Sequence, residues 1–245
     1  KTVYYAKLLP DGTVLRLSSV RVCSPIPHPE QDIICLGVNY AAHADESAQF
    51  DRKAFLLDRK KATYFSKRAY QTSGPDDLIP SYPELVTSLD YEAELAVIIG
   101  RDCKNVCERH AAACIFGYTV LNDVSARNLQ TEHNQWYFGK SLDGFTPMGP
   151  CIVTEDEIPY PPALSISSTV NGELRQNSNT KYLLHSISEI IAELSQGMTL
   201  LAGTIIATGT PAGVGMGFDP PKFLKSGDVV TCEIEKIGRL TNMVK

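Results

Sequence analysis

The segment Leu89-Asp-Tyr-Glu-Ala-Glu-Leu-Ala-Val-Ile-Ile-Gly100 begins with acidic residues and continues as an apolar run that ends at a glycine. The β-branched residues of this run predict a buried strand over 94–99. Residues two apart on a strand point to the same face, so Glu92 and Glu94 should lie side by side. Two adjacent carboxylates repel each other and need a cation to stay ionised together. Oxygen ligands select a hard divalent ion such as Mg²⁺, Mn²⁺ or Ca²⁺; the alternative is a solvated acidic strand edge.

Further strands are predicted on both sides of this segment. Short apolar or alternating runs predict them over 33–36, 117–121, 164–170, 204–208, 228–234 and 240–244. The pair Asn171-Gly172 is typical of a two-residue hairpin turn. Ser186 and Glu189 form a capping box for a helix that ends at Gly197, and a second helix is predicted over about 107–115. Because strands outnumber helices and do not alternate with them, the predicted fold class is α+β and mainly β.

The overall composition is that of a globular protein and argues against several classes of partner. The chain has 245 residues, of which 43% are hydrophobic, and a formal net charge of −5. No long basic run is present, which disfavours nucleic acid and an anionic membrane surface as partners. The longest apolar stretches are far shorter than the ~20 residues that a membrane-spanning helix needs.

The first residues are predicted to be separate from the rest of the chain. The proline-containing stretch 23–29 predicts a boundary between a short N-terminal β appendage over 1–28 and a single domain over 29–245. The N-terminus shows no apolar, signal-like core. The seven cysteines are odd in number and lack the spacing of a zinc site, which favours reduced thiols and a cytoplasmic location.

Two other polar patterns are candidates for chemistry. Asp123 follows the apolar run 117–121, where a carboxylate is costly unless it is capped, paired or metal-bound. An N-cap of the next helix explains Asp123 equally well. His43 and Glu46 would be neighbours on a helical turn, where the carboxylate would fix the imidazole tautomer and raise its basicity. A surface histidine in an acidic helix is the more ordinary explanation of such a pair.

A lysine and a glycine-rich segment complete the set of candidates. Lys140 lies between the aromatic stretch 136–138 and a Pro/Gly turn, and beside a metal it would stabilise an oxyanion or enolate. A solvated loop lysine is the ordinary alternative. In 207–217 the glycines would let the backbone approach a ligand, and Thr210 could hydrogen-bond a carboxylate. A tight structural turn is an equally good explanation of this segment.

The order of these motifs is more specific than any one of them. The chain contains, in sequence, Asn39-Tyr-x-x-His-x-x-Glu46, the segment 89–100, Asn122-Asp-Val-Ser-Ala-Arg-x-Leu-Gln130, Gly139-Lys-Ser-x-Asp-Gly-Phe-x-Pro-x-Gly-Pro150 and Thr208-Gly-Thr-Pro-Ala-Gly-Val-Gly215. From about residue 30 to 245 this arrangement resembles the fumarylacetoacetate hydrolase family.

The resemblance implies a fold, a metal and a set of site residues. The expected fold is a mixed β-sandwich roll, usually a homodimer, that carries the catalytic site in 29–245. One Mg²⁺ or Mn²⁺ per chain, with Ca²⁺ as a substitute, is expected to be held by the matching carboxylates of Glu92, Glu94 and Asp123. The positions that match catalytic residues are His43, Glu46 and Lys140, and those that match substrate-binding residues are Arg127, Gln130 and Thr210.

The reaction that the resemblance implies is hydrolysis of a carbon–carbon bond in a 2,4-dioxo acid, such as an acylpyruvate, through a metal-stabilised pyruvate enolate. Decarboxylation of oxaloacetate-like acids and isomerisation or decarboxylation of 2-hydroxy-dienedioates are the alternatives. A non-catalytic metal-binding protein is a more distant one. Two loops depart from the family pattern, at 202–204 and at 62–68, where both expected prolines are missing. These departures leave the identity of the small 2-oxo acid substrate open.

Overall fold

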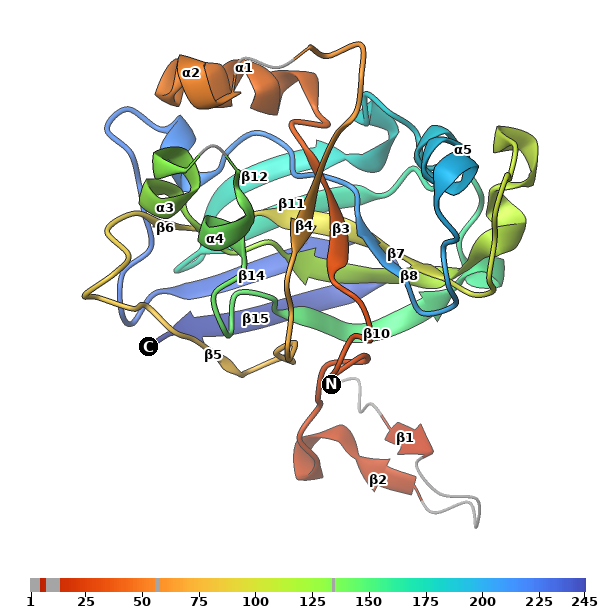
Figure 1. Cartoon of the computed structure of the whole chain (residues 1–245). Coiled ribbons are helices and arrows are strands. Elements are labelled where there is room, and N and C mark those ends of the chain that lie inside the picture. Colours follow the sequence, from red (N-terminus) through yellow and green to blue (C-terminus); the bar gives the residue numbers. More distant parts are fainter. Residues whose placement is uncertain (1–4, 8–13, 56–57, 134) are drawn as a thin grey trace.

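The computed structural model describes residues 5–7, 14–55, 58–133 and 135–245, and two β-sheets dominate it (Figure 1). The six-stranded sheet has the order β10-β8-β7-β13-β3-β4. Its strands are β3 (Ile33–Gly37), β4 (Thr63–Lys67), β7 (Ala93–Ile99), β8 (Ile115–Asn122), β10 (Met148–Thr154) and β13 (Ile205–Ala207). The five-stranded sheet has the order β12-β11-β14-β15-β5. Its strands are β5 (Leu78–Ile79), β11 (Ser165–Val170), β12 (Glu173–Asn179), β14 (Val229–Ile234) and β15 (Gly238–Val244).

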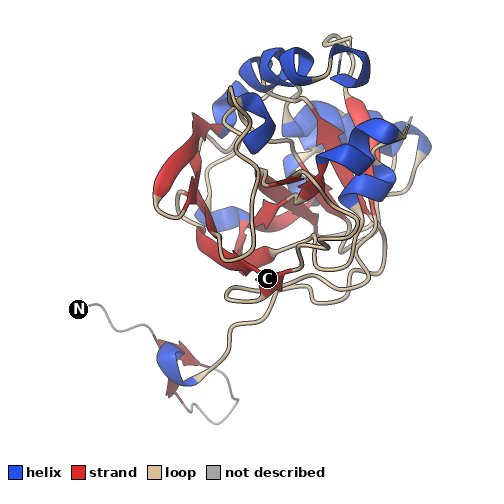
Figure 2. Ribbon diagram, turned by 90° about the vertical axis from the view of Figure 1, so that its left-hand side faces the viewer, coloured by secondary structure: helices blue, strands red, loops and turns tan. Residues whose placement is uncertain are grey.

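Two short strand pairs and a few helices complete the structure. The pairs are β1 (Tyr5–Lys7) with β2 (Val14–Arg16) and β6 (Leu89–Asp90) with β9 (Ser125–Ala126). The α-helices are α1 (Ala41–Phe50), α2 (Arg52–Phe55), α3 (Arg127–Glu132), α4 (Tyr137–Lys140) and α5 (Ile187–Gly197). The described part of β1 and β2 lies apart from both sheets (Figure 2). Among the described helices, none has the length and apolar character that crossing a membrane requires.

Strand β7 lies at the centre of the six-stranded sheet because its apolar side chains serve two cores. All seven of its residues are buried. Leu95 and Val97 pack in the core shared with the five-stranded sheet, whereas Ala96 and Ile98 pack in a second core on the other face. A strand buried on both faces is expected to read as a continuous apolar run, as the segment 95–99 does.

The predicted fold class is confirmed, and so are most of the predicted elements. The Asn171-Gly172 turn joins β11 to β12, with positive φ at both residues. Ser186 and Glu189 form the predicted capping box of α5. The helix predicted over about 107–115 is wrong, because the chain there forms two 3₁₀ turns, Glu108–His110 and Ala112–Cys114. In the part of the chain that the structure describes, no side chain caps either turn. The Cys114 carbonyl accepts a hydrogen bond from the Gly100 amide, and the chain then enters β8. The division of the chain at residue 28 stays a prediction.

Candidate active site

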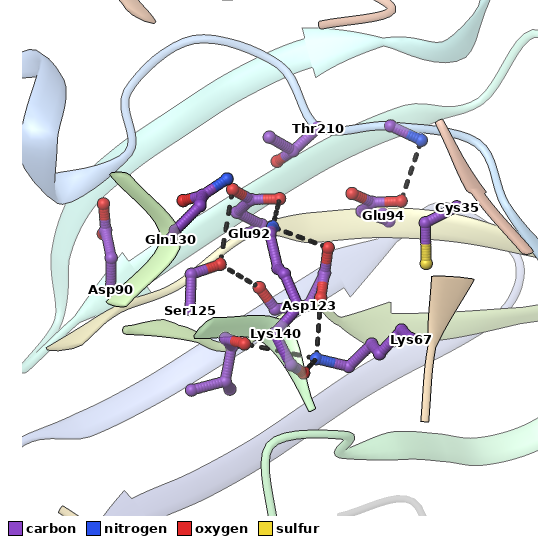
Figure 3. Close-up of polar contacts among 12 residues, drawn as sticks. Cys35, Lys67, Asp90, Glu92, Glu94, Asp123, Ser125, Gln130, Lys140 and Thr210 are labelled. Atoms are coloured by element: carbon purple, nitrogen blue, oxygen red, sulfur yellow. Dashed lines mark hydrogen bonds and ion pairs between the residues drawn. The ribbon is translucent and has the colours of Figure 1, made fainter. Parts of the chain in front are cut away.

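Three buried acids meet where β7 begins and β8 ends. The two strands are antiparallel, with Ala93 opposite Asn122, so Glu92 and Glu94 lie close to Asp123. One carboxylate oxygen from each of the three lies within 4.8 Å of the others. Figure 3 shows this convergence. The interpretation of Asp123 as a helix cap is wrong, because α3 starts at Arg127 with Ala126 as its N-cap residue.

Two lysines enter this acidic cluster. The Nζ of Lys140 lies 2.8 Å from Glu92 Oε2 and 2.7 Å from Asp123 Oδ2. The Nζ of Lys67 lies 2.7 Å from Asp123 Oδ1 and also donates to the carbonyls of Val124 and Lys140 (Figure 3). Both lysines are almost completely buried, which excludes the solvated-loop interpretation of Lys140. Lys67 was not among the residues predicted for the site. It lies in the segment 62–68, which was expected to be a loop and instead contains β4.

The two glutamates differ in electrostatic environment although they are neighbours. Burial works to raise the pKa of Glu92, but the adjacent Lys140 and Arg127 hold it well below its ordinary value. Burial, together with the negative charges of Asp123 and Glu92, holds the pKa of Glu94 well above its ordinary value. Glu94 accepts a hydrogen bond from the Gly209 amide at 2.8 Å. Among the described residues, no lysine or arginine forms an ion pair with it.

The donor set therefore fits a hard divalent cation. All three converging ligands are carboxylates, which Mg²⁺ and Mn²⁺ prefer over nitrogen or sulfur donors. A cation beside Glu94 would compensate the buried charge that the protein itself leaves without a partner. The solvated strand edge is excluded, because Glu92 and Glu94 are 5% and 1% exposed.

Arg127 and Gln130 were expected to bind substrate. Both are on α3, and they lie beside the acidic triad. Arg127 Nε donates to Asp90 at 2.9 Å, and Nη1 donates to Glu92 at 2.6 Å and to Gln130 Oε1 at 2.9 Å. Its remaining nitrogen, Nη2, is buried without a hydrogen-bond partner among the described residues. Thr210 differs, because its hydroxyl already donates to the Ala93 carbonyl and accepts from a glutamine side chain. Substrate binding by Arg127, Gln130 and Thr210 stays a prediction.

The predicted histidine–glutamate pair is formed on α1. His43 Nδ1 lies 3.1 Å from Glu46 Oε2, and both side chains are largely buried. A carboxylate partner places the proton on Nδ1 and leaves Nε2 as the basic nitrogen. The Ser47 hydroxyl lies 3.4 Å from Nε2. The surface-histidine interpretation is therefore excluded, and the ring can act as a base.

A small cavity connects Glu92 of the triad with this histidine. It is lined by His43, Glu92, Lys140 and an aromatic wall of Phe55, Phe65 and Trp136, together with Leu36, Gly37, Val38, Arg127, Gln130 and Thr210. Its volume of about 10 Å³ suits roughly one water molecule. A roomier hollow of about 590 Å³ is lined by residues such as Arg21 and Asp76 and contains none of the three acids. The small cavity is therefore the candidate site, because it alone of the two brings an acid of the triad and His43 together.

Comparison with known proteins agrees with this geometry. The profile of the family described as "Fumarylacetoacetate (FAA) hydrolase C-terminal" matches residues 32–245. The chain belongs to the fumarylacetoacetate hydrolase family. Within it, the chain is 45% identical over 228 residues to "Oxaloacetate tautomerase YisK" of Bacillus subtilis (strain 168), covering 93% of this chain and 74% of that protein.

Solved structures of the fumarylacetoacetate hydrolase family share the fold. One is the "Fumarylacetoacetate hydrolase (EaFAH)" from Exiguobacterium antarcticum, with a TM-score of 0.84, 45% identity and coverage of 95% of this chain and 81% of that one. Another is a "2-hydroxyhepta-2,4-diene-1,7-dioate isomerase" from Mycobacterium marinum, with a TM-score of 0.76, 36% identity and coverage of 95% and 81%. The named relatives are thus enzymes of more than one reaction type.

Proposed function

We propose that this chain is a divalent-metal-dependent enzyme that interconverts the keto and enol forms of a small 2-oxo dicarboxylic acid of the oxaloacetate type. The observation that carries the proposal is the buried carboxylate triad Glu92, Glu94 and Asp123, of which Glu92 lines the same cavity as His43. The 45% identity to a protein named as an oxaloacetate tautomerase supports the choice of reaction.

Charge balance explains why a divalent ion and an acid substrate would fit together. Four buried carboxylates, those of the triad and of Asp90, face three buried cations, Lys67, Lys140 and Arg127. Bound Mg²⁺ or Mn²⁺ supplies Lewis acidity that lowers the free energy of an enolate. It also makes the local charge positive, which favours an anionic acid over water.

The side chains would share the proton transfer as follows. His43 Nε2 removes a proton from C3 of the keto acid, and the electron pair of that C–H bond forms the C2–C3 double bond. The Lys140 ammonium stabilises the negative charge that develops on the C2 oxygen. The proton that His43 holds is then transferred to this oxygen and gives the enol, so that the base is regenerated and the reaction needs no other reactant. Glu46 holds the imidazole in the tautomer that this step requires.

Hydrolysis of an acylpyruvate is a second candidate, favoured by the intact His43–Glu46 pair. In that reaction His43 takes a proton from water, and the oxygen attacks the carbonyl carbon distal to the pyruvate unit. The C–C bond breaks, its electron pair forms the pyruvate enolate, and protonation at C3 yields pyruvate and a carboxylic acid.

An assay with metal-stripped protein tests both candidates. Enol absorbance is followed with oxaloacetate, and pyruvate release is followed with acetylpyruvate, each with Mn²⁺, with Mg²⁺ or with EDTA. We expect metal-dependent oxaloacetate tautomerisation that exceeds acetylpyruvate cleavage. His43→Ala should abolish turnover while changing Mn²⁺ affinity by less than about threefold, and His110→Ala, an exposed histidine outside the cavity, should change neither. Absence of turnover with all of these 2-oxo acids in the presence of metal would refute the proposal.

A further inference from the structure

Asp90 is a buried carboxylate for which the proposed reaction has no direct use. It ends β6, two residues before Glu92, and is fully buried. Its Oδ1 accepts hydrogen bonds from the amides of Gly215 at 2.6 Å and Tyr91 at 2.9 Å. Its Oδ2 accepts from Arg127 Nε at 2.9 Å and from the Met216 amide at 3.0 Å. Four donors on two oxygens fix this side chain firmly in one orientation.

One side of Asp90 faces the metal ligands. Arg127 spans Asp90 and Glu92 with two different nitrogens of its planar guanidinium, Nε and Nη1. Since that group is rigid, fixing Nε on Asp90 also fixes Nη1 on Glu92. Asp90 is thus joined to the acidic triad through a single side chain.

The other side of Asp90 faces the loop 213–217. The same loop also contacts Glu46 of α1. The Gly213 amide donates to Glu46 Oε1 at 2.9 Å, while Glu46 Oε2 contacts His43. A Cβ on Gly217 would lie 1.7 Å from Glu46 Oε1, so the glutamate occupies the space beside that glycine. A Cβ on Gly215 would lie 2.6 Å from Asp90 Oδ1. Because Gly215 and Gly217 have no side chains, the carboxylates of Asp90 and Glu46 can both approach this short loop.

We propose that Asp90 is a positioning residue that, through the loop 213–217, holds the Glu46–His43 pair in register with the metal ligands. The inference rests on the proposed function, in which His43 is the base. The path consists of consecutive contacts: Asp90 to the amides of Gly215 and Met216, the loop to Gly213, and Gly213 to Glu46. Tyr91 supports the same loop from its other end, because its hydroxyl donates to the Gly213 carbonyl at 2.8 Å.

A double-mutant cycle on turnover tests this path. Asp90→Asn replaces an acceptor oxygen with a donor, so at least one of the four donors loses its partner. We expect kcat to fall about 10- to 100-fold, because small displacements of catalytic groups have effects of this size. We expect KM and Mn²⁺ affinity to change by less than about threefold. In a Glu46→Gln background, Asp90→Asn should lower kcat by less than about threefold, because the path that it acts through is already broken.

Two further variants separate positioning from a loss of fold. Tyr91→Phe removes the hydroxyl that donates to Gly213 and leaves the charge of Asp90 in place. It should lower kcat by less than Asp90→Asn does, and it should have no effect in the Glu46→Gln background. Asp77→Asn is the matched control, because Asp77 likewise pairs with an arginine, Arg21, and accepts from a backbone amide, that of Gly74. It contacts neither the loop nor the acids in the described structure, and it should leave kcat unchanged. Equal effects of Asp90→Asn in both backgrounds, or loss of Mn²⁺ binding, would overturn the proposal.

Hydrogen exchange keeps the inference separate from the proposed function. If the wild-type protein turns over none of the tested acids, amide exchange within 213–217 still reports the contacts of Asp90. We expect faster exchange there in Asp90→Asn and wild-type exchange in Asp77→Asn. Unchanged exchange in Asp90→Asn would show that this residue does not hold the loop, whatever the substrate.

Discussion

Replacing Gly217 with alanine places a methyl group in the space that the Glu46 carboxylate fills. The new Cβ would lie 1.7 Å from Oε1 and 2.0 Å from Cδ, far inside van der Waals contact. The backbone of Gly217 has no positive φ, so alanine meets no conformational penalty there. Glu46 must therefore swing away, and it loses both the Gly213 amide and His43.

The size of this effect follows from the contacts that are lost. Leaving the buried partners of a carboxylate unsatisfied costs about 1–3 kcal/mol, and a Gly→Ala change returns about 0.4–1 kcal/mol through the unfolded chain. We expect a net loss of about 1–2 kcal/mol, which lowers the Tm of a chain of this length by about 2–8 °C. Turnover should fall to the level of Glu46→Ala.

The assay is thermal unfolding of Gly217→Ala, Glu46→Ala and the double variant, each measured with EDTA. In the Glu46→Ala background the methyl group enters vacated space, so Gly217→Ala should leave Tm unchanged or raise it slightly. Gly197→Ala is the control, because a Cβ there would have no atom of the described residues within 4 Å. An equal fall in Tm from Gly217→Ala in both backgrounds would refute the reasoning, since something other than Glu46 would then fill the space.

Other measurements test separate parts of the structure. Glu94→Gln should weaken Mn²⁺ binding about 100-fold or more by calorimetry, yet raise Tm in EDTA, because it removes a buried carboxylate whose pKa is raised. The ionised form of Glu94 destabilises the fold, so metal-free wild-type protein should lose stability as pH rises above the ordinary glutamate pKa. Glu94→Gln should lose less stability over the same pH range. Equal slopes of stability against pH in the two proteins would contradict this. Gly172→Ala should cost about 1 kcal/mol with unchanged turnover, because φ is +81° and no described residue lies within 4 Å of the added Cβ. An unchanged Tm would contradict the turn assignment. Iodoacetamide should label the exposed cysteines first, as followed by mass spectrometry, because burial raises the pKa of Cys103 to about 11 and of Cys232 to about 12. Early labelling of the buried thiols would count against the fold. The exposed cysteines are Cys23, Cys107 and Cys151.

The sequence predicted those parts of the site that local pattern controls. Glu92 and Glu94 precede or start a continuous apolar strand, and Asp123 follows another one, so antiparallel pairing of the two strands suffices to bring the acids together. The i, i+3 spacing of His43 and Glu46 likewise specifies a contact within one helix. Hydrophobic periodicity is also a local pattern, and it was sufficient to predict the fold class.

Long-range contacts determine the parts that the sequence did not predict. Lys67 lies on an edge strand in an ordinary polar context, and only the pairing of β3 with β4 brings its ammonium to Asp123. Asp90 accepts hydrogen bonds from the backbone amides of Gly215 and Met216, which lie 125 and 126 positions further along the chain. No local motif encodes such contacts. The failed helix near residue 110 has a similar cause, because tertiary pairing at Gly100 outweighed a weak local preference.

The place of β13 in the six-stranded sheet has a consequence for biosynthesis. This strand lies between β7 and β3, and Ile206 pairs with Ile34, which precedes it by more than 170 residues. A ribosome that has released the chain only as far as residue 200 has therefore made every carboxylate of the triad but not the strand that lies between β7 and β3. Sheets joined by such distant segments form slowly. Until β13 emerges, β7 and β3 have no strand between them, and the acids that β7 positions lack part of the sheet that buries them.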